Sequence, residues 1–273
     1  MAVLTISRQV AALGDEIATA LAKKLGYTFI DRKQIESRIV ELGFPKEKLS
    51  KYDERKPGFF ASLVKDRDEY LDYLQLAVYE AAEKGNCILI GRGAYIILED
   101  LPNLLSFRFV APDNIRLERL EKEFNWNQKQ AQARIDESDQ NRRGFHKSFF
   151  NMNNEGPESF HMVLNTGLLG IDESVKAIEQ IVKNTITPEK EKAGEVRIKE
   201  LLLGQQLVNR LIFDCKININ FLRANITGNT VMLHGVADSQ AIVEKAINQA
   251  ANILPTYKIE SSISVVQDFK AYH

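Results

Sequence analysis

The sequence has few of the residues on which cross-linked or metal-bound folds depend: two cysteines and four histidines among 273 residues. Cys87 and Cys215 lie far apart in apolar runs, so both are predicted to be core residues, and no metal site is expected because its ligands would have to be clustered. No apolar run reaches the ~20 residues that span a bilayer, and the N-terminus lacks the basic start and apolar stretch of a signal peptide. A cytoplasmic protein without a transmembrane segment is predicted.

An excess of charge of one sign is also missing. Lys and Arg number 36 against 37 Asp and Glu, a net charge of -1. Nucleic-acid polymers are held largely by net positive charge, so none is expected as a partner. A small anionic ligand bound by a few local arginines is compatible with this balance.

Short apolar runs alternate with helical patterns through the first two thirds of the chain. Ile17, Leu21 and Leu25 mark a helix that Gly26 should end, a long polar helix is predicted from 114 to about 143, and a loop is predicted at 50–60. The expected strands lie at 3–6, 27–30, 87–90, 105–110 and 160–164. Such alternation predicts an α/β fold, a parallel sheet with helices on both faces.

The composition changes near residue 187. Residues 187–194 contain Pro188, Gly194 and alternating charges without a large apolar residue, which is typical of a linker. Beyond them, a helix, a turn at Thr227–Asn229, a second helix and an alternating strand at 258–266 predict a small α+β domain. The expected organisation is a domain at 1–187, a linker at 188–194 and a domain at 195–273.

The connection after the first strand is where nucleotide-binding α/β proteins hold phosphates, because free N–H groups and the helix dipole meet the anion there. The strong motif for that site is G-x-x-x-x-G-K-[ST]. This chain has Ala11, Ala12, Leu13 and Gly14, followed by Asp15, without the lysine. Alanine and leucine disfavour the positive-φ conformations that aim N–H groups at a phosphate, and a carboxylate at Asp15 would repel one.

Several motifs nevertheless occur in the order found in a known family. They are Ile6-Ser7-Arg8, Gly14-x-Glu16-Ile17-Ala18, Leu25-Gly26-Tyr27, Asp31-Arg32, Cys87-Ile88-Leu89-Ile90-Gly91-Arg92-Gly93-Ala94, Phe107–Pro112 with Arg116 and Arg119, Asp139-x-x-Arg142 and Asn165-Thr166. Over about 185 residues the chain thereby resembles the cytidylate kinase-like proteins, a branch of the P-loop nucleoside-monophosphate kinases.

The resemblance implies a phosphotransferase that moves a phosphoryl group from ATP, with Mg²⁺, to CMP or a related nucleotide. It implies ATP binding by Arg8, Ala11, Ala12, Leu13, Gly14, Asp15 and Glu16. It implies acceptor binding by Asp31, Arg32, Gly91, Arg92 and Asp139. The implied catalytic residues are Arg142, Arg143 and Arg92, because the transfer needs positioning and positive charge on the phosphate oxygens. Nucleotides are thus the expected small-molecule partners.

Each assignment has a structural alternative. Arg116 and Arg119 lie one turn apart among glutamates and could form a solvated salt-bridging face. Asp139 and Arg142 could be a surface helix pair, and Asp31 could cap a helix. At the level of function, the alternative to a kinase is a catalytically impaired nucleotide-binding regulatory protein.

The tail is similar to a second module, the BON domain. The matching residues are Ile226 to Val236, the helix from Ala241 and the strand at 259–266. The resemblance implies contact with a ligand or a protein partner, or a homo-oligomeric contact, through this domain.

Overall fold

The computed structural model describes residues 1–49, 52, 64–153 and 156–266. Except for Tyr52, the predicted loop at 50–60 lies outside the described residues. The chain divides into two compact units, Met1–Glu195 and Val196–His273, and each is described by itself. In the described part of the chain, no helix is long and apolar enough to cross a membrane.

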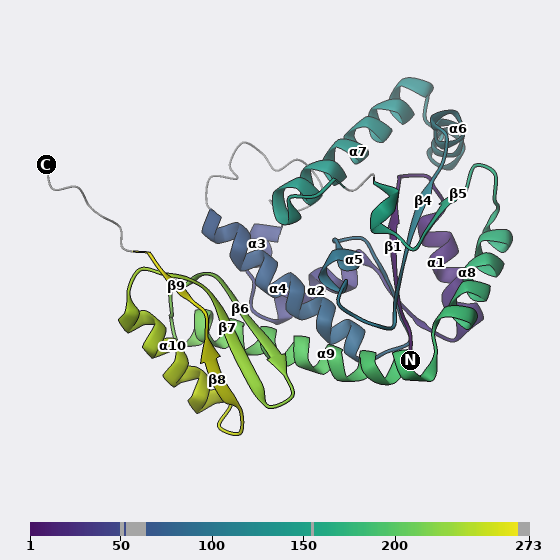
Figure 1. Cartoon of the computed structure of the whole chain (residues 1–273). Coiled ribbons are helices and arrows are strands. Elements are labelled where there is room, and N and C mark those ends of the chain that lie inside the picture. The colour runs from purple at the N-terminus through teal and green to yellow at the C-terminus, as the bar shows by residue number, and fades with distance from the viewer. Residues whose placement is uncertain (50–51, 53–63, 154–155, 267–273) are drawn as a thin grey trace, which may run out of the picture. The chain divides into compact units, whose positions relative to one another are not determined.

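The first unit is built on a five-stranded parallel sheet, which confirms the predicted class (Figure 1). Its strands run in the order β2-β3-β1-β4-β5. Their bounds are β1 Val3–Arg8, β2 Thr28–Ile30, β3 Cys87–Ile90, β4 Leu104–Val110 and β5 Met162–Asn165. The central strand β1 pairs with β3 on one side and β4 on the other, so their carboxyl ends meet at one edge.

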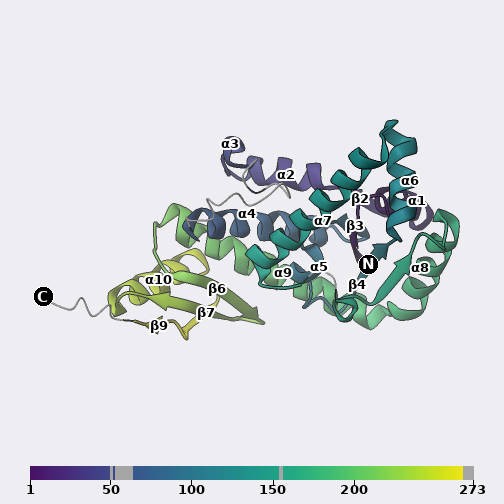
Figure 2. The ribbon, with the colours of Figure 1, turned by 90° about the horizontal axis from the view of Figure 1, so that it is seen from above.

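Helices cover both faces of this sheet (Figures 1 and 2). Ile17 and Leu21 of α1 (Gly14–Leu25) and Ile178 of α8 (Ile171–Thr185) pack with β1, β3 and β4 in one buried core. Burial also raises the pKa of the Cys87 thiol to about 12, in keeping with its predicted place in the core. The other helices of this unit are α2 (Arg32–Glu41), α3 (Lys46–Leu49), α4 (Val64–Glu83), α5 (Ala94–Ile97), α6 (Asp113–Phe124), α7 (Gln128–Phe150) and a 3-10 turn at Pro157–Ser159.

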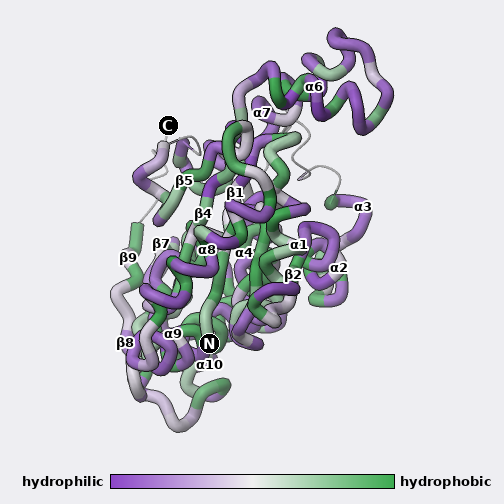
Figure 3. Tube along the Cα trace, turned by 90° about the vertical axis from the view of Figure 1, so that its right-hand side faces the viewer, coloured by the Kyte–Doolittle hydropathy of each residue, from purple (hydrophilic) through white to green (hydrophobic). Residues whose placement is uncertain are grey.

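Local caps explain where helices end. Gly26 ends α1 with φ 68, as predicted. The long polar helix predicted from 114 to 143 is wrong, because the chain breaks into α6 and α7. Asn125 ends α6 in the left-handed region, and Asn127 starts α7 with a capping box that includes Gln130. Both helices are largely hydrophilic along their length, whereas β1 and β4 are hydrophobic (Figure 3).

The predicted linker at 188–194 is helical, forming the first turns of α9 (Pro188–Asn209). Pro188 suits a first helical position, where its missing N–H is not needed. Thr187 caps the helix, because its hydroxyl oxygen accepts a hydrogen bond from the Lys190 amide at 3.4 Å.

The second unit is an α+β structure, as its pattern predicts. It contains the end of α9, a π-helical turn at Arg210–Asp214, and α10 (Gln240–Ile253), together with β6 (Asn220–Thr227), β7 (Thr230–Ala237), β8 (Lys258–Ser261) and β9 (Ser264–Val265). β6 and β7 form an antiparallel hairpin, and β8 and β9 both pair with β7 in parallel. The strand expected at 258–266 is therefore two short strands.

Candidate functional site

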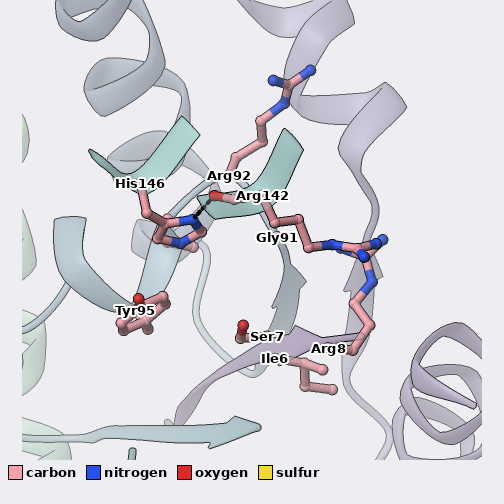
Figure 4. A pocket seen from close by; sticks show the side chains of 10 residues that line it. Ile6, Ser7, Arg8, Gly91, Arg92, Tyr95, Arg142 and His146 are labelled. Carbon is pink, nitrogen blue, oxygen red and sulfur yellow. Dashed lines mark hydrogen bonds between the residues drawn. The ribbon is translucent and has the colours of Figure 1, made fainter. Parts of the chain in front are cut away.

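A pocket lies where β1 and β3 end. Its lining consists of Ile6, Ser7, Arg8, Gly91, Arg92, Gly93, Ala94, Tyr95, Arg142 and His146. These residues come from the carboxyl ends of two neighbouring parallel strands, from the start of α5 and from α7 (Figure 4). In open parallel sheets, ligands bind at the carboxyl ends of the strands. They bind next to the strand from which successive connections lead toward opposite edges of the sheet. The topology therefore places the pocket where this fold class binds ligands.

The loop between β1 and α1 takes a conformation that its side chains disfavour. Ala11 has φ 59 and Leu13 has φ 54. Both residues thus adopt positive φ although alanine and leucine disfavour it. Left-handed backbone costs a residue with a Cβ roughly 1–2 kcal/mol, so other contacts must hold the loop in this shape.

Three side chains supply those contacts by binding three successive carbonyl oxygens of the loop. Arg116 Nε donates to the Val10 carbonyl at 3.0 Å, and Arg119 Nη1 donates to the Ala11 carbonyl at 2.9 Å. Thr166 Oγ1 donates to the Ala12 carbonyl at 3.1 Å. With its carbonyls fixed, the loop keeps the positive φ angles that its own sequence would not select.

The amides of the loop differ from its carbonyls in their hydrogen bonding. Leu13 is the N-cap of α1 and provides no side-chain hydrogen bond to it. Among the described residues, the N–H groups of Ala11, Leu13 and Gly14 donate no backbone hydrogen bond. Such N–H groups at a helix N-terminus attract anions, and together with the helix dipole they form a phosphate-binding concavity.

A pair of glycine substitutions measures the strain in the loop. We expect Ala11→Gly to raise the free energy of unfolding by about 0.5–1 kcal/mol, because glycine adopts positive φ without a Cβ clash. Ala12→Gly is the matched control: Ala12 is buried and has no positive φ, so glycine there should destabilise the protein. Urea unfolding of both variants provides the comparison. Destabilisation of equal size in both would contradict strain at Ala11.

Two arginines bring positive charge to the pocket. Arg8 ends β1, and its Nη2 lies 3.9 Å from Asp15 Oδ2. Arg142 projects from α7, donates to Ser138 Oγ at 2.6 Å, and lies 3.9 Å from Asp139. In Figure 4 the side chains of Arg8 and Arg142 extend toward one another from opposite walls. Two guanidinium groups that converge on one space favour an anion there.

The Arg8 stem lies directly over Gly14. A Cβ at residue 14 would come within 2.6 Å of Arg8 Cγ and 3.0 Å of its Cβ, so only glycine leaves room for this arginine. Asp15 is 65% exposed, so its carboxylate does not fill the pocket, and Leu13 packs against the core. Glu16 is also exposed.

The predicted alternative of a solvated salt-bridging face is wrong for Arg116 and Arg119. Arg116 is only 1% exposed, and its Nη2 lies 2.9 Å from both carboxylate oxygens of Asp139. Arg119 Nη2 donates to the Thr166 carbonyl at 2.6 Å. Both arginines hold the loop in place. Asp139, predicted to bind the acceptor, is engaged by Arg116 in this structure.

The acceptor residues predicted near the ends of β2 and β3 have partners within the protein. Arg92 is 2% exposed, donates to the Tyr52 carbonyl at 2.8 Å and pairs with Glu36. Its guanidinium points away from Ser7 in Figure 4. Gly91 lines the pocket through its backbone.

The remaining predicted residues lie outside the pocket lining. Asp31 caps α2 through a capping box with Gln34, as its alternative predicts. The Arg32 Nε lies 3.5 Å from a Glu36 oxygen. Arg143 is exposed on α7 and does not line the pocket. Acceptor binding by Asp31 and Arg32, and phosphate contact by Arg143, stay predictions.

The structure adds residues to which the sequence assigned no role in the site. Ser7, Tyr95 and His146 line the pocket, and Arg108, 5% exposed, donates to Ser7 Oγ at 3.2 Å. His146 Nδ1 lies 2.8 Å from the Arg142 carbonyl, which it can only approach as a donor. Tyr95 directly follows the matched motif at 87–94, which is the one signal that could have marked it.

Within the described residues, no group of three or more His, Cys, Asp or Glu is arranged to hold a metal ion. Mg²⁺ in kinases keeps several waters and is held by one or two carboxylates together with the substrate phosphates. Asp15 and Glu16 are the carboxylates at the start of α1; both are exposed, and Asp15 lies 3.9 Å from Arg8.

A parallel sheet covered by helices, with a loop in the phosphate-binding position after its central strand, defines a P-loop kinase-like fold. The chain belongs to the Cytidylate kinase-like family, whose sequence profile matches residues 3–168. No curated protein matches the sequence significantly.

Several solved structures are similar to this chain at low sequence identity. An uncharacterised protein from Eubacterium ventriosum is 16% identical with a TM-score of 0.53, covering 67% of this chain and 99% of that one. Shikimate kinase from Bacteroides thetaiotaomicron is 15% identical with a TM-score of 0.43, covering 67% and 98%. A gluconokinase from Sinorhizobium meliloti is 13% identical with a TM-score of 0.42, covering 67% and 94%. At such identities the likeness concerns the fold alone.

Proposed function

We propose that the first unit is a nucleoside monophosphate kinase-like phosphotransferase that uses ATP and Mg²⁺ to phosphorylate CMP or a related nucleotide. The observation that carries the proposal is the loop at residues 9–13, held by its carbonyls so that its amides are left for an anion. Membership of the cytidylate kinase-like family supports the reaction class.

In this proposal the loop from Ala11 to Glu16 holds the ATP phosphates, and Arg8 supplies the charge that lysine supplies in the standard motif. Phosphoryl transfer depends mainly on positioning and on positive charge around the phosphate oxygens. Mg²⁺, when bound, would neutralise charge on the nucleotide phosphates.

The acceptor would bind in the pocket beside Gly91, toward Asp31 and Arg32. Arg142 extends into the same pocket from α7 and would contact the transferred phosphoryl group. For Arg92, Arg143 and Asp139 to contact ligand, each would have to exchange its present position or partner for the phosphate. That exchange is part of the proposal.

One observation favours the alternative, a nucleotide-binding regulatory protein without catalysis. The loop carries Asp15 beside Arg8, at 3.9 Å, and no lysine follows Gly14. At about 6 Å, a carboxylate repels a phosphate charge by about 3 kcal/mol at an effective dielectric constant near 20. In this alternative the BON-like second unit would contact a ligand or partner.

The test is calorimetry of the full chain with ATP and CMP separately, followed by measurement of ADP formation with both ligands and Mg²⁺. We expect both ligands to bind, ADP to form, and Arg142→Ala to lower kcat about 10²- to 10³-fold. Arg134→Ala is the matched control, because Arg134 is an exposed arginine of the same helix that pairs with Glu137. CMP binding without ATP binding or ADP formation would favour the alternative.

A further inference from the structure

Tyr95 carries a hydroxyl for which the described part of the structure offers no partner. The side chain is 6% exposed, and its oxygen is buried without a hydrogen bond. The ring packs against Phe160, with centroids 4.6 Å apart, and stacks with His146 at 5.7 Å. The ring is thus well held, and only its polar end is left unsatisfied.

A buried hydroxyl without a partner costs stability, so its presence calls for a reason. Burial raises the pKa of Tyr95 to about 12, with Arg108 acting in the opposite direction. The hydroxyl therefore keeps its hydrogen at neutral pH and is available as a donor.

The surroundings indicate what the hydroxyl donates to. Tyr95 lines the pocket that Arg8 and Arg142 enter, and Arg108 places another positive charge beside Ser7. Ser7 Oγ accepts the hydrogen bond from Arg108, so its own hydrogen is also left for the pocket. In Figure 4 Ser7 lies next to Arg8 at the end of β1, on the side toward Tyr95. Hydroxyl donors and guanidinium groups around one space suit an oxyanion.

We propose that the Tyr95 hydroxyl donates a hydrogen bond to an oxygen of a phosphate group bound in this pocket. Tyr95 is then a phosphate-binding residue, and its buried hydroxyl is satisfied only when ligand is present. The inference rests on the proposed function in one respect: the phosphate would be that of the acceptor nucleotide. Inorganic phosphate has the same chemistry and serves as the simpler probe.

The test compares Tyr95→Phe with wild type in the full chain. Phenylalanine keeps the ring and its stacking but removes the donor. Without ligand, we expect Tyr95→Phe to unfold at the same temperature as wild type or a higher one, because an unsatisfied hydroxyl is lost. With inorganic phosphate or CMP, titration calorimetry should give a dissociation constant about 10- to 100-fold larger than that of wild type.

Thr5→Val is the matched control. Thr5 is 1% exposed in β1, its hydroxyl is also buried without a partner, and it does not line the pocket. This variant should gain thermal stability as Tyr95→Phe does while binding phosphate and CMP with unchanged affinity. A lower affinity in both variants would mean a general packing effect and would overturn the inference.

The outcomes separate this inference from the proposed function. If wild type binds phosphate and CMP, and Tyr95→Phe binds them equally well, the inference is wrong and the kinase proposal stands. If the variant loses affinity but wild type forms no ADP with ATP and CMP, the inference stands and the kinase proposal fails. If wild type binds neither phosphate nor CMP, the pocket is not an oxyanion site and the inference is wrong.

Discussion

Replacing Arg116 by methionine is expected to lower the free energy of unfolding by about 3–5 kcal/mol. Arg116 is 1% exposed and donates to both oxygens of Asp139, which is only 19% exposed. Removing one member of a buried ion pair costs this much, because Asp139 keeps only the more distant Arg142, at 3.9 Å, to compensate its charge. The Val10 carbonyl also loses its donor at 3.0 Å. Denaturant unfolding measures the change.

Two further variants show whether the ion pair is the cause. Arg134→Met removes an arginine that is 39% exposed and bonded to Glu137, so the cost should stay within ~1 kcal/mol. Combining Arg116→Met with Asp139→Asn removes the orphaned charge and should recover part of the lost stability. A loss below ~1 kcal/mol for Arg116→Met, or no recovery in the double variant, would contradict the role assigned to this pair.

The sequence predicts the architecture well because the strands are short, apolar and continuous. Cys87–Ile90 could only be a buried strand, and it lies next to β1 in the sheet. Elements whose form depends on caps were harder to predict. The break between α6 and α7 depends on Asn125 in the left-handed region and on the Asn127 cap, and both are local features within an otherwise helical pattern.

The loop at residues 9–13 could not be predicted from local preferences. Its left-handed residues are set by hydrogen bonds from Arg116, Arg119 and Thr166, which lie more than 100 residues away along the chain. Tertiary contacts thus override the conformational preference of Ala11 and Leu13. The motif order places these arginines near the loop, but nothing in the motifs indicates that they bind its carbonyls.

The lining of the pocket was predicted only in part, because it also depends on contacts between segments that are distant in the chain. Arg8, Arg142 and Gly91 carry the family resemblance and do line it. His146 has no distinguishing pattern, since a histidine within a polar helix is ordinary. Ser7 belongs to the matched motif Ile6-Ser7-Arg8, but the motif assigned it no role. Their role depends on which strand and helix ends the fold brings together.

The contact between Arg8 and Gly14 leads to a large expected effect on activity. A Cβ at residue 14 would lie 2.6 Å from Arg8 Cγ, and the atoms involved belong to the stem near the backbone, so Arg8 must leave its position. We expect Gly14→Ala to lower kcat/KM for phosphoryl transfer by about 10²-fold, the usual result of misplacing one charged group at the reacting phosphates. The φ of residue 14 is not positive, so alanine adds no backbone strain of its own.

A double-mutant cycle with Arg8→Ala tests whether the effect acts through Arg8. Arg8→Ala alone should reduce kcat/KM by a similar factor. Because the shortened side chain makes room for the new Cβ, adding Gly14→Ala to it should cost little more, so that the two losses are far from additive. If the losses multiply instead, Gly14 acts on the loop by a route that does not involve Arg8. An unchanged kcat/KM in Arg8→Ala alone would mean that the guanidinium of Arg8 is not the charge that replaces the missing lysine at the ATP phosphates.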